Sequence, residues 1–324
     1  MLKCAIIGLG RWGQVLVDSV QGKSEKLTFV RGVTRTPANA ADYAAKLGIP
    51  LSADYSGALS DHDVDAIVLA TPHTQHAEQM TAAAAAKKHI FVEKPLTLDT
   101  ASAISSVEKA RDAGVVLALG HNRRFLPPIL EMKRRIERGD IGKVIHADAN
   151  FSGNPSLRHG NEHWRTNIDE TPAGAMSPIG IHMLDLLICL CGRINTVNAQ
   201  SFRLATDLPI DDTTSMTFRF ESGMSACFTT LGATARTMRL QIFGTEGWLE
   251  LRDESPLVFQ PMDGPSETID YPLFDKERAE LEAFADAVDR KSNYPLSDAE
   301  AIHGIEVFEA IVKSADGAGT VNIG

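Results

Sequence analysis

A glycine-rich turn close to the N-terminus places the strongest constraint on the fold of this chain. Residues 4–7 (CAII) predict a buried strand, residues 8–13 (GLGRWG) follow at once, and residues 12–20 can form a helix. A strand, a G-x-G-x-x-G turn and a helix in this order are typical of a dinucleotide-binding unit. Gly8 would permit the tight turn, Gly10 would let the backbone approach a pyrophosphate, and Gly13 would let the helix pack closely on the strand. We therefore expect a cofactor at the helix N-terminus, with a purely structural turn as the alternative.

The end of the second predicted strand bears on which dinucleotide binds. Residues 27–33 (LTFVRGV) predict that strand, and Thr34, Arg35 and Thr36 follow it. A site selective for NAD usually has an acidic residue here, which accepts hydrogen bonds from the ribose hydroxyls. Two hydroxyls and a guanidinium instead suit the 2′-phosphate of NADP through charge-assisted hydrogen bonds. We therefore expect NADP in preference to NAD, with a solvated loop arginine as the simpler interpretation of Arg35.

The length and charge of the chain restrict its partners. The 324 residues can form two domains, and a hydrophobic content of 44% is enough for two cores. The net charge of -10 argues against nucleic acid or an anionic membrane surface as the main partner, because both attract basic patches. A small molecule is the expected partner.

The sequence shows no targeting or membrane segment. No apolar run is long enough to span a bilayer, and the first residues lack the pattern of a signal peptide. Cys4, Cys189, Cys191 and Cys227 do not have the paired spacing of a zinc site, and nothing implies an oxidising compartment. We expect a cytoplasmic protein.

Two regions with different patterns of predicted secondary structure follow one another along the chain. Up to residue 121, short apolar strands (65–70, 89–92 and 115–119) alternate with helical segments (73–87 and 99–113). This alternation predicts a parallel sheet with crossover helices, a Rossmann domain over residues 1–121.

Residues 122–324 predict a separate α+β domain. Strand-like runs succeed one another without intervening helices, which indicates an open, mainly antiparallel sheet. The predicted strands are 143–151, 196–204, 213–221, 224–231, 239–243 and 247–251, and the predicted helices are 127–138, 180–190, 275–290 and 297–314.

Two motifs lie where strands of the first domain end, which is the edge where such sheets bind ligands. Thr71-Pro72 and His76 follow the strand at 65–70 and can contact the nicotinamide half of a cofactor. A solvated or capping role is the simpler interpretation of His73 and His76.

The second motif, Glu93-Lys94-Pro95, ends the next strand. Proline fixes the exit of the chain, so Lys94 can be directed at a substrate hydroxyl and stabilise an alkoxide; a surface lysine paired with an acid is the alternative.

His182 and Asp185 lie three residues apart on one face of a predicted helix that is apolar nearly all round. A buried imidazole beside a carboxylate can act as a general base. Alternatively, the two side chains could form hydrogen bonds with each other, or with nearby backbone groups, in a core.

Residues 159–163 are a candidate metal site. His159-Gly160-Asn161-Glu162-His163 has helix-like ligand spacing, but Gly160 and the loop context argue against it, so no metal is expected.

These motifs together resemble the glucose-fructose oxidoreductase, inositol dehydrogenase and MocA family. The resemblance rests on residues 8–13, Ala70-Thr71-Pro72 with His76, Glu93-Lys94-Pro95, Asn122-Arg123-Arg124-Phe125, His163-Trp164-Arg165 and residues 180–185 (GIHMLD), in the order and spacing of that family. It covers most of the chain and is weakest after about Asp253. The E-K-P tripeptide combined with the later G-x-H-x-x-D element is its most specific part.

The resemblance implies reversible hydride transfer between NAD(P) and a sugar, cyclitol or related polyol, and a second domain whose open sheet often mediates oligomers, so that a homodimer or homotetramer is expected. Lys94 and His182 would assist proton transfer. Many family members have an aspartate four residues before the histidine, where this chain has Pro178, and Asp185 could orient His182 instead. A non-catalytic, NADP-binding regulator on the same scaffold is the alternative function.

The resulting site hypothesis has three parts. The catalytic residues are Lys94, His182 and Asp185. The substrate-binding residues are Lys94, Asn122, Arg124, Arg165 and His182, although Asn122, Arg124 and Arg165 could equally be structural. The cofactor-binding residues are Gly8, Gly10, Arg11, Trp12, Gly13, Thr34, Arg35, Thr36, Thr71, Pro72, His76, Glu93 and Lys94.

Overall fold

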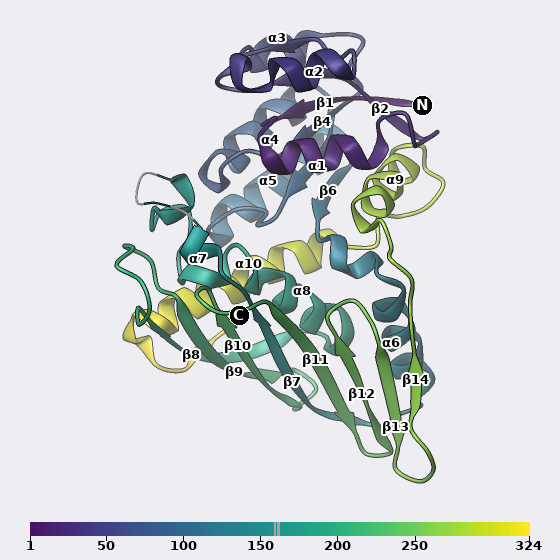
Figure 1. The fold of residues 1–324 in the computed structure, drawn as a ribbon, viewed down its shortest axis with the longest axis vertical. Coiled ribbons are helices and arrows are strands. Elements are labelled where there is room, and N and C mark those ends of the chain that lie inside the picture. Colours follow the sequence, from purple (N-terminus) through teal and green to yellow (C-terminus); the bar gives the residue numbers. More distant parts are fainter. Residues whose placement is uncertain (159, 161–162) are drawn as a thin grey trace. The chain divides into compact units, whose positions relative to one another are not determined.

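The computed structural model describes residues 1–158, 160 and 163–324, which form two compact units (Figure 1). One unit comprises Met1–Asn122 with Asp275–Ile302, and the other comprises Arg123–Phe274 with His303–Gly324. This division differs from one at 1–121 and 122–324, because Asp275–Ile302 returns to the first unit.

The first unit contains the expected parallel sheet. Its six strands follow the order β3-β2-β1-β4-β5-β6, and every pair is parallel. The order reverses between β1 and β4, which is where folds of this type bind ligands. The strands are β1 (Leu2–Ile7), β2 (Leu27–Val33), β3 (Leu51–Ser52), β4 (Ala66–Leu69), β5 (His89–Glu93) and β6 (Leu117–Gly120).

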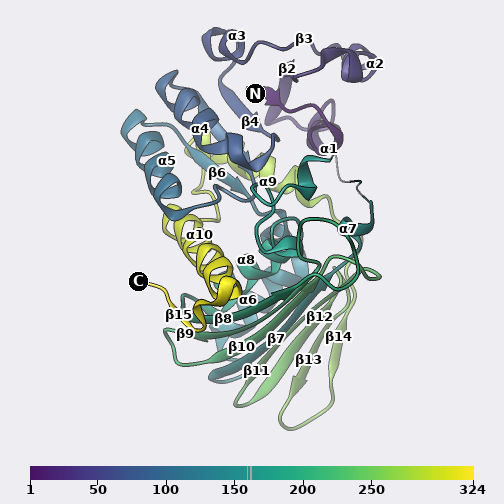
Figure 2. The same ribbon diagram turned by 90° about the vertical axis from the view of Figure 1, so that its left-hand side faces the viewer.

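Helices cover both faces of this sheet. Helices α4 and α5 lie side by side on one face, and α1 and α9 pack together on the other (Figure 2). Asp99 caps α5 by accepting a hydrogen bond from the backbone N–H of Ser102, and Gly114 ends this helix in the left-handed conformation. The helices are α1 (Arg11–Val20), α2 (Ala41–Lys46), α3 (Tyr55–Ser60), α4 (His76–Ala85), α5 (Thr100–Ala113) and α9 (Lys276–Val288).

Helix α9 belongs to the first unit because its apolar side chains complete that unit's core. Leu281 and Phe284 are fully buried in the cluster that contains Leu16 and Phe29. The rings of Phe284 and Phe91 lie 5.9 Å apart between centroids. The periodicity of residues 275–290 predicted this helix, but a local pattern does not identify the core against which a helix packs.

The second unit is built on a mixed sheet that is mainly antiparallel. Its nine strands follow the order β14-β13-β12-β11-β7-β10-β9-β8-β15, and within this sheet β7 and β10 pair in parallel. Its strands are β7 (Val144–Ser152), β8 (Ile194–Phe202), β9 (Thr213–Phe220), β10 (Ser225–Leu231), β11 (Thr237–Gly244), β12 (Gly247–Arg252), β13 (Leu257–Pro261), β14 (Glu267–Ile269) and β15 (Val321–Asn322).

Alternating burial along these strands defines an inner and an outer face. Helices α6 (Pro127–Arg138) and α8 (Gly180–Cys191) pack over the inner face, together with the short α7 (Pro155–Arg158) and the part of α10 (Asp298–Lys313) that belongs to this unit (Figure 2). Helix α8 is buried almost all round, as its continuous apolar sequence predicts.

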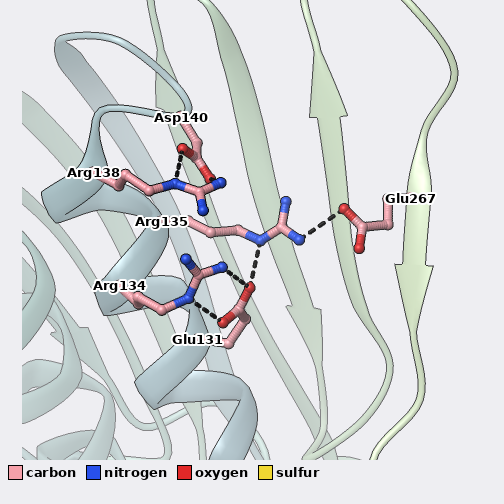
Figure 3. Close-up of polar contacts among 6 residues, drawn as sticks. All are labelled: Glu131, Arg134, Arg135, Arg138, Asp140 and Glu267. Carbon is pink, nitrogen blue, oxygen red and sulfur yellow. Dashed lines mark hydrogen bonds and ion pairs between the residues drawn. The ribbon is translucent and has the colours of Figure 1, made fainter.

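An ion pair connects α6 to the edge strand β14 (Figure 3). Arg135 donates to Glu131 within the helix and to Glu267 of β14, each at 2.7 Å. Its guanidinium also lies 4.7 Å from the ring centroid of Phe259 in β13. Strands β13 and β14 were not among the predicted elements, since β13 has only a short apolar run, β14 has three residues, and neither shows a period-2 pattern.

Nowhere in the described part of the chain does a helix combine the length and the apolar character of a membrane span.

Like β13 and β14, the short elements were not predicted, because each has six residues or fewer and its pattern is too short to distinguish from a loop. They are α2, α3, α7, β3 and β15.

Candidate active site

The turn between β1 and α1 has the geometry of a phosphate-binding loop. Gly8 has a φ of 95°, and a Cβ there would collide with the carbonyl oxygen of Ala70; a Cβ at Gly13 would collide with the carbonyl oxygen of Gly8. At Gly10, no described atom lies within 4 Å of the position that a Cβ would take. Two of the glycines are therefore required by the protein itself, and the third leaves room for a ligand. This arrangement fits a bound pyrophosphate.

Helix α1 starts at Arg11, directly behind this open space. Its N-cap is Gly10, which has no side chain to accept hydrogen bonds from the first turn. The N–H groups of that turn are thus available to a phosphate, with the partial positive charge of the helix N-terminus behind them.

Arg35 lies at the expected distance along the chain for reading the adenosine ribose. Arg35 and Thr36 are exposed after β2, and the backbone N–H of Thr34 donates to the carbonyl of Ser52 at 3.0 Å. Among the residues that the structure describes, no carboxylate is paired with Arg35, whereas Arg31 in the same strand region pairs with Asp61 at 2.7 Å. The Arg35 guanidinium is therefore accessible to an anionic ligand.

His76 connects the loops that follow β4 and β5. Its ring is fully buried, with Nδ1 2.8 Å from the carbonyl oxygen of Pro95 and Nε2 3.2 Å from that of Thr71. His73 is also buried, at a ring centroid distance of 5.9 Å from His76. In this arrangement His76 fixes the backbone on both sides of the expected nicotinamide-binding edge.

Glu93, the last residue of β5, is a buried carboxyl group at the same edge. Burial raises the pKa of Glu93 to about 7, although the nearby indole of Trp12 and the charge of Lys94 oppose this shift. Glu93 Oε1 lies 3.1 Å from the position of a Cβ at Gly120 in β6, so a side chain there would crowd the carboxyl group.

Two further residues lie at this edge, Lys276 and Glu277 of α9, and neither was among the predicted site residues. Asn122 Nδ2 donates to Glu277 Oε1 at 3.0 Å, and Lys276 Nζ lies 3.6 Å from the same oxygen. The negative charge of Glu277 also contributes to the raised pKa of Glu93. No local signal could have identified Glu277, because it is 155 positions from Asn122 along the chain.

In the second unit, Arg124 and Asp185 form a buried ion pair. Arg124 Nε lies 3.0 and 2.9 Å from the two carboxylate oxygens of Asp185, and Nη2 lies 2.8 Å from Oδ1. The side chains are only 3% and 7% exposed. A buried pair of this kind holds both groups in place, since removal of one leaves the other charge buried. The structure thus joins a residue expected to bind substrate to one expected to assist catalysis.

His182 lies in the first turn of α8. It is buried, and its ring centroid is 6.3 Å from that of Phe151 in β7. Three positions further on, the Arg124–Asp185 pair anchors the same helix.

Arg165 and Pro178 line one hollow of the second unit, together with Ser156, Thr166 and Ile210. The Arg165 guanidinium lies 4.3 Å from the ring centroid of Trp164, and its backbone N–H donates to His163 Nδ1. Pro178, the position compared above with an aspartate, therefore borders the same hollow as Arg165. Of the alternative metal motif, His159, Asn161 and Glu162 lie outside the described residues.

Two family models match this chain. Residues 2–121 match the oxidoreductase family with an NAD-binding Rossmann fold, and residues 129–250 match the GFO/IDH/MocA C-terminal domain.

Curated relatives include dehydrogenases. The chain is 39% identical over 150 residues to the NAD-dependent scyllo-inositol 2-dehydrogenase of Bacillus subtilis, a match that covers 45% of this chain and 43% of that enzyme. It is 26% identical to the NADP-dependent D-xylose 1-dehydrogenase 2 of Haloferax volcanii, over 95% of both chains.

Solved structures show the same fold over the whole chain. A protein of Desulfitobacterium hafniense, provisionally described as an NADPH-dependent oxidoreductase, has a TM-score of 0.93 at 26% identity, covering 99% of this chain and 97% of that one. Levoglucosan dehydrogenase in complex with NADH and levoglucosan has a TM-score of 0.90 at 22% identity, covering 99% of both chains, which shows the fold.

Proposed function

Because this chain belongs to the GFO/IDH/MocA family of NAD(P)-binding oxidoreductases, we propose that it transfers a hydride between a nicotinamide cofactor and a hydroxyl-bearing carbon of a sugar, cyclitol or related polyol. The open space at Gly10, between two glycines that the protein itself requires, is the structural observation that best supports this function. The names of the inositol and xylose dehydrogenases among its relatives support the substrate class.

The nicotinamide supplies the hydride chemistry, and the first unit binds the cofactor. Gly8 to Gly13 and the start of α1 would hold the pyrophosphate, while Thr71 and Pro72, fixed by His76, would hold the nicotinamide half. Arg35, with Thr34 and Thr36, favours NADP, since an accessible guanidinium between two hydroxyls suits a 2′-phosphate.

Lys94 stabilises the substrate alkoxide in this proposal. The ammonium group donates a hydrogen bond to the reacting oxygen, so negative charge is compensated as it develops. Glu93 next to it is buried and has a raised pKa. At neutral pH its carboxyl group is therefore protonated to a greater extent than that of an exposed glutamate. A neutral neighbour leaves more of the positive charge of Lys94 for the substrate.

His182 accepts the hydroxyl proton as the hydride leaves carbon. Asp185 is a positioning residue in this proposal, because it is bound by Arg124 and anchors the turn of α8 that carries His182. Arg165 binds substrate oxygens from the hollow that it shares with Pro178, and Asn122 is oriented by Glu277.

A fluorescence titration tests the cofactor part of this function. NADPH should bind more tightly than NADH, and Arg35→Ala should weaken NADPH binding about tenfold to a hundredfold while leaving NADH binding nearly unchanged, since charge-assisted hydrogen bonds contribute about 1.5–3 kcal/mol. Lys46→Ala, which removes another cation of the first unit, is the matched control. Equal binding of both cofactors, or no effect of Arg35→Ala, would refute the role of Arg35.

We propose further that the second unit mediates a homodimer or homotetramer through its sheet, whose outer face is not covered by helices in the described residues. Sedimentation of the intact protein tests this directly, because a monomer at micromolar concentration would rule it out.

A further inference from the structure

The outer face of the sheet in the second unit carries a group of metal-ligating side chains that the proposed function does not use. His146 and Asp148 lie on β7, and Cys227 lies on the neighbouring strand β10. One ligand atom from each residue lies within 4.8 Å of the other two. The three side chains offer an imidazole nitrogen, a carboxylate oxygen and a thiol sulfur.

The strand register brings these side chains together. Ala147 and Ala149 of β7 point into the core, so the alternate residues His146 and Asp148 point outward. β7 and β10 pair in parallel, with His146 opposite Ser225 and Asp148 opposite Cys227. Two strands of a regular sheet thus hold all three ligands, which is a more rigid support than a loop.

The imidazole of His146 is already oriented by a second residue. Its Nδ1 lies 2.8 Å from Ser225 Oγ, and its Nε2 lies 3.5 Å from Asp148 Oδ1. Metal-binding histidines commonly use the second ring nitrogen for such an orienting hydrogen bond. The 3.5 Å separation is close to the roughly 3.3 Å expected between a nitrogen and an oxygen bound to one tetrahedral zinc ion.

We propose that His146, Asp148 and Cys227 bind one divalent transition-metal ion of the zinc class. His146 Nε2, a carboxylate oxygen of Asp148 and the Cys227 thiolate provide three ligands, and water completes a tetrahedron. The thiolate and the imidazole favour zinc over magnesium or calcium, which prefer oxygen ligands. The Cys227 side chain is exposed and turns about a single χ angle, so its sulfur can reach the ion without movement of the backbone. Binding displaces the thiol proton, so affinity rises with pH.

A close contact between His146 and Asp148 without a metal function is the alternative. That pair does not need Cys227. The role of the thiol therefore distinguishes the two interpretations.

Titration of the intact, reduced protein with Co²⁺ as the probe tests the proposal. One equivalent should bind, with the visible bands of tetrahedral cobalt and a thiolate-to-cobalt charge-transfer band, and Zn²⁺ should displace it. Cys227→Ser should remove the charge-transfer band and weaken binding more than tenfold. Ser225→Ala should weaken binding about tenfold, as expected for loss of an orienting hydrogen bond.

Cys191→Ser is the matched control, because Cys191 is also a free cysteine but lies at the end of α8. It should leave both the band and the affinity unchanged. Absence of saturable Co²⁺ binding, or binding with the same spectrum and affinity in Cys227→Ser, would overturn the proposal. Ser225 and Cys227 lie on the outer face of the sheet, which we also propose as the subunit interface, so circular dichroism and sedimentation verify that each variant is folded and assembles as the wild type does.

Discussion

At the scale of single residues, the end of β5 combines an acidic and a basic side chain in different environments. Glu93 is 6% exposed, and its carboxyl group has Trp12, Lys94 and Glu277 among its electrostatic neighbours. Burial of a charge without full compensation is costly, and sites of chemistry are where proteins often tolerate such a cost.

The raised pKa of Glu93 predicts how stability depends on pH. Its pKa rises from 4.5 to about 7 on folding, so between these values the folded state binds more protons than the unfolded state. The contribution of Glu93 to the free energy of unfolding therefore falls as the pH rises through this window, by up to about 3 kcal/mol.

Glu93→Gln should remove this pH dependence. Relative to wild type, the variant should therefore gain more stability near pH 7 than near pH 5. Urea unfolding at several pH values measures the difference from wild type. Glu78→Gln, at an exposed carboxylate, should not change the slope, and an unchanged slope in Glu93→Gln would contradict the prediction.

The role of an individual residue could be predicted from the sequence where local geometry alone defines it. Gly8 and Gly13 could be assigned from the turn pattern, because the pattern itself fixes the close contacts that exclude a Cβ. The pairing of Arg124 with Asp185 could not, since these residues are 61 positions apart and the local sequence around an arginine gives no sign of its partner.

At the scale of elements, α9 shows how a helix can be predicted correctly and its packing remain undetermined. Its pattern and its Asp275 N-cap are visible in the sequence. Its partner is not, because an amphipathic helix fits any apolar surface. The edge strand β14 and its neighbour β13 show the opposite case, since the sequence gives little signal and an ion pair from α6 helps to hold β14 in place (Figure 3).

The position of α9 leads to a prediction for Phe284. Phe284→Ala should destabilise the first unit by about 3–5 kcal/mol, because it leaves a cavity in a core that includes Leu16, Phe29 and Phe91. Amide hydrogen exchange should therefore accelerate in β1, β5 and α1, and not in β9 or β10 of the other unit. The exposed Phe274 provides the control, since Phe274→Ala removes the same ring without a buried cavity. Faster exchange confined to β9 and β10 would contradict the assignment of α9 to the first unit.

At the scale of the whole molecule, the sequence predicted a parallel nucleotide-binding sheet followed by a mainly antiparallel one, and both are confirmed. Both follow from composition along the chain, because alternation of strands and helices requires crossover connections and a succession of strands does not. The return of Asp275–Ile302 to the first unit could not be predicted in this way, since it depends on contacts between distant segments.

We propose that this protein oxidises or reduces a polyol with the help of Lys94 and His182. The most direct measurement is the rate of nicotinamide reduction over a panel of cyclitols and sugars, for the wild-type protein, Lys94→Ala and His182→Ala. Lys143→Ala and His62→Ala serve as controls, because both replace exposed side chains of the same types. We expect turnover by the wild type and both controls, and a loss of about a hundredfold or more in each active-site variant, in line with the usual contribution of acid–base groups. Unchanged turnover in Lys94→Ala and His182→Ala, or tight cofactor binding without turnover of any polyol, would contradict the account.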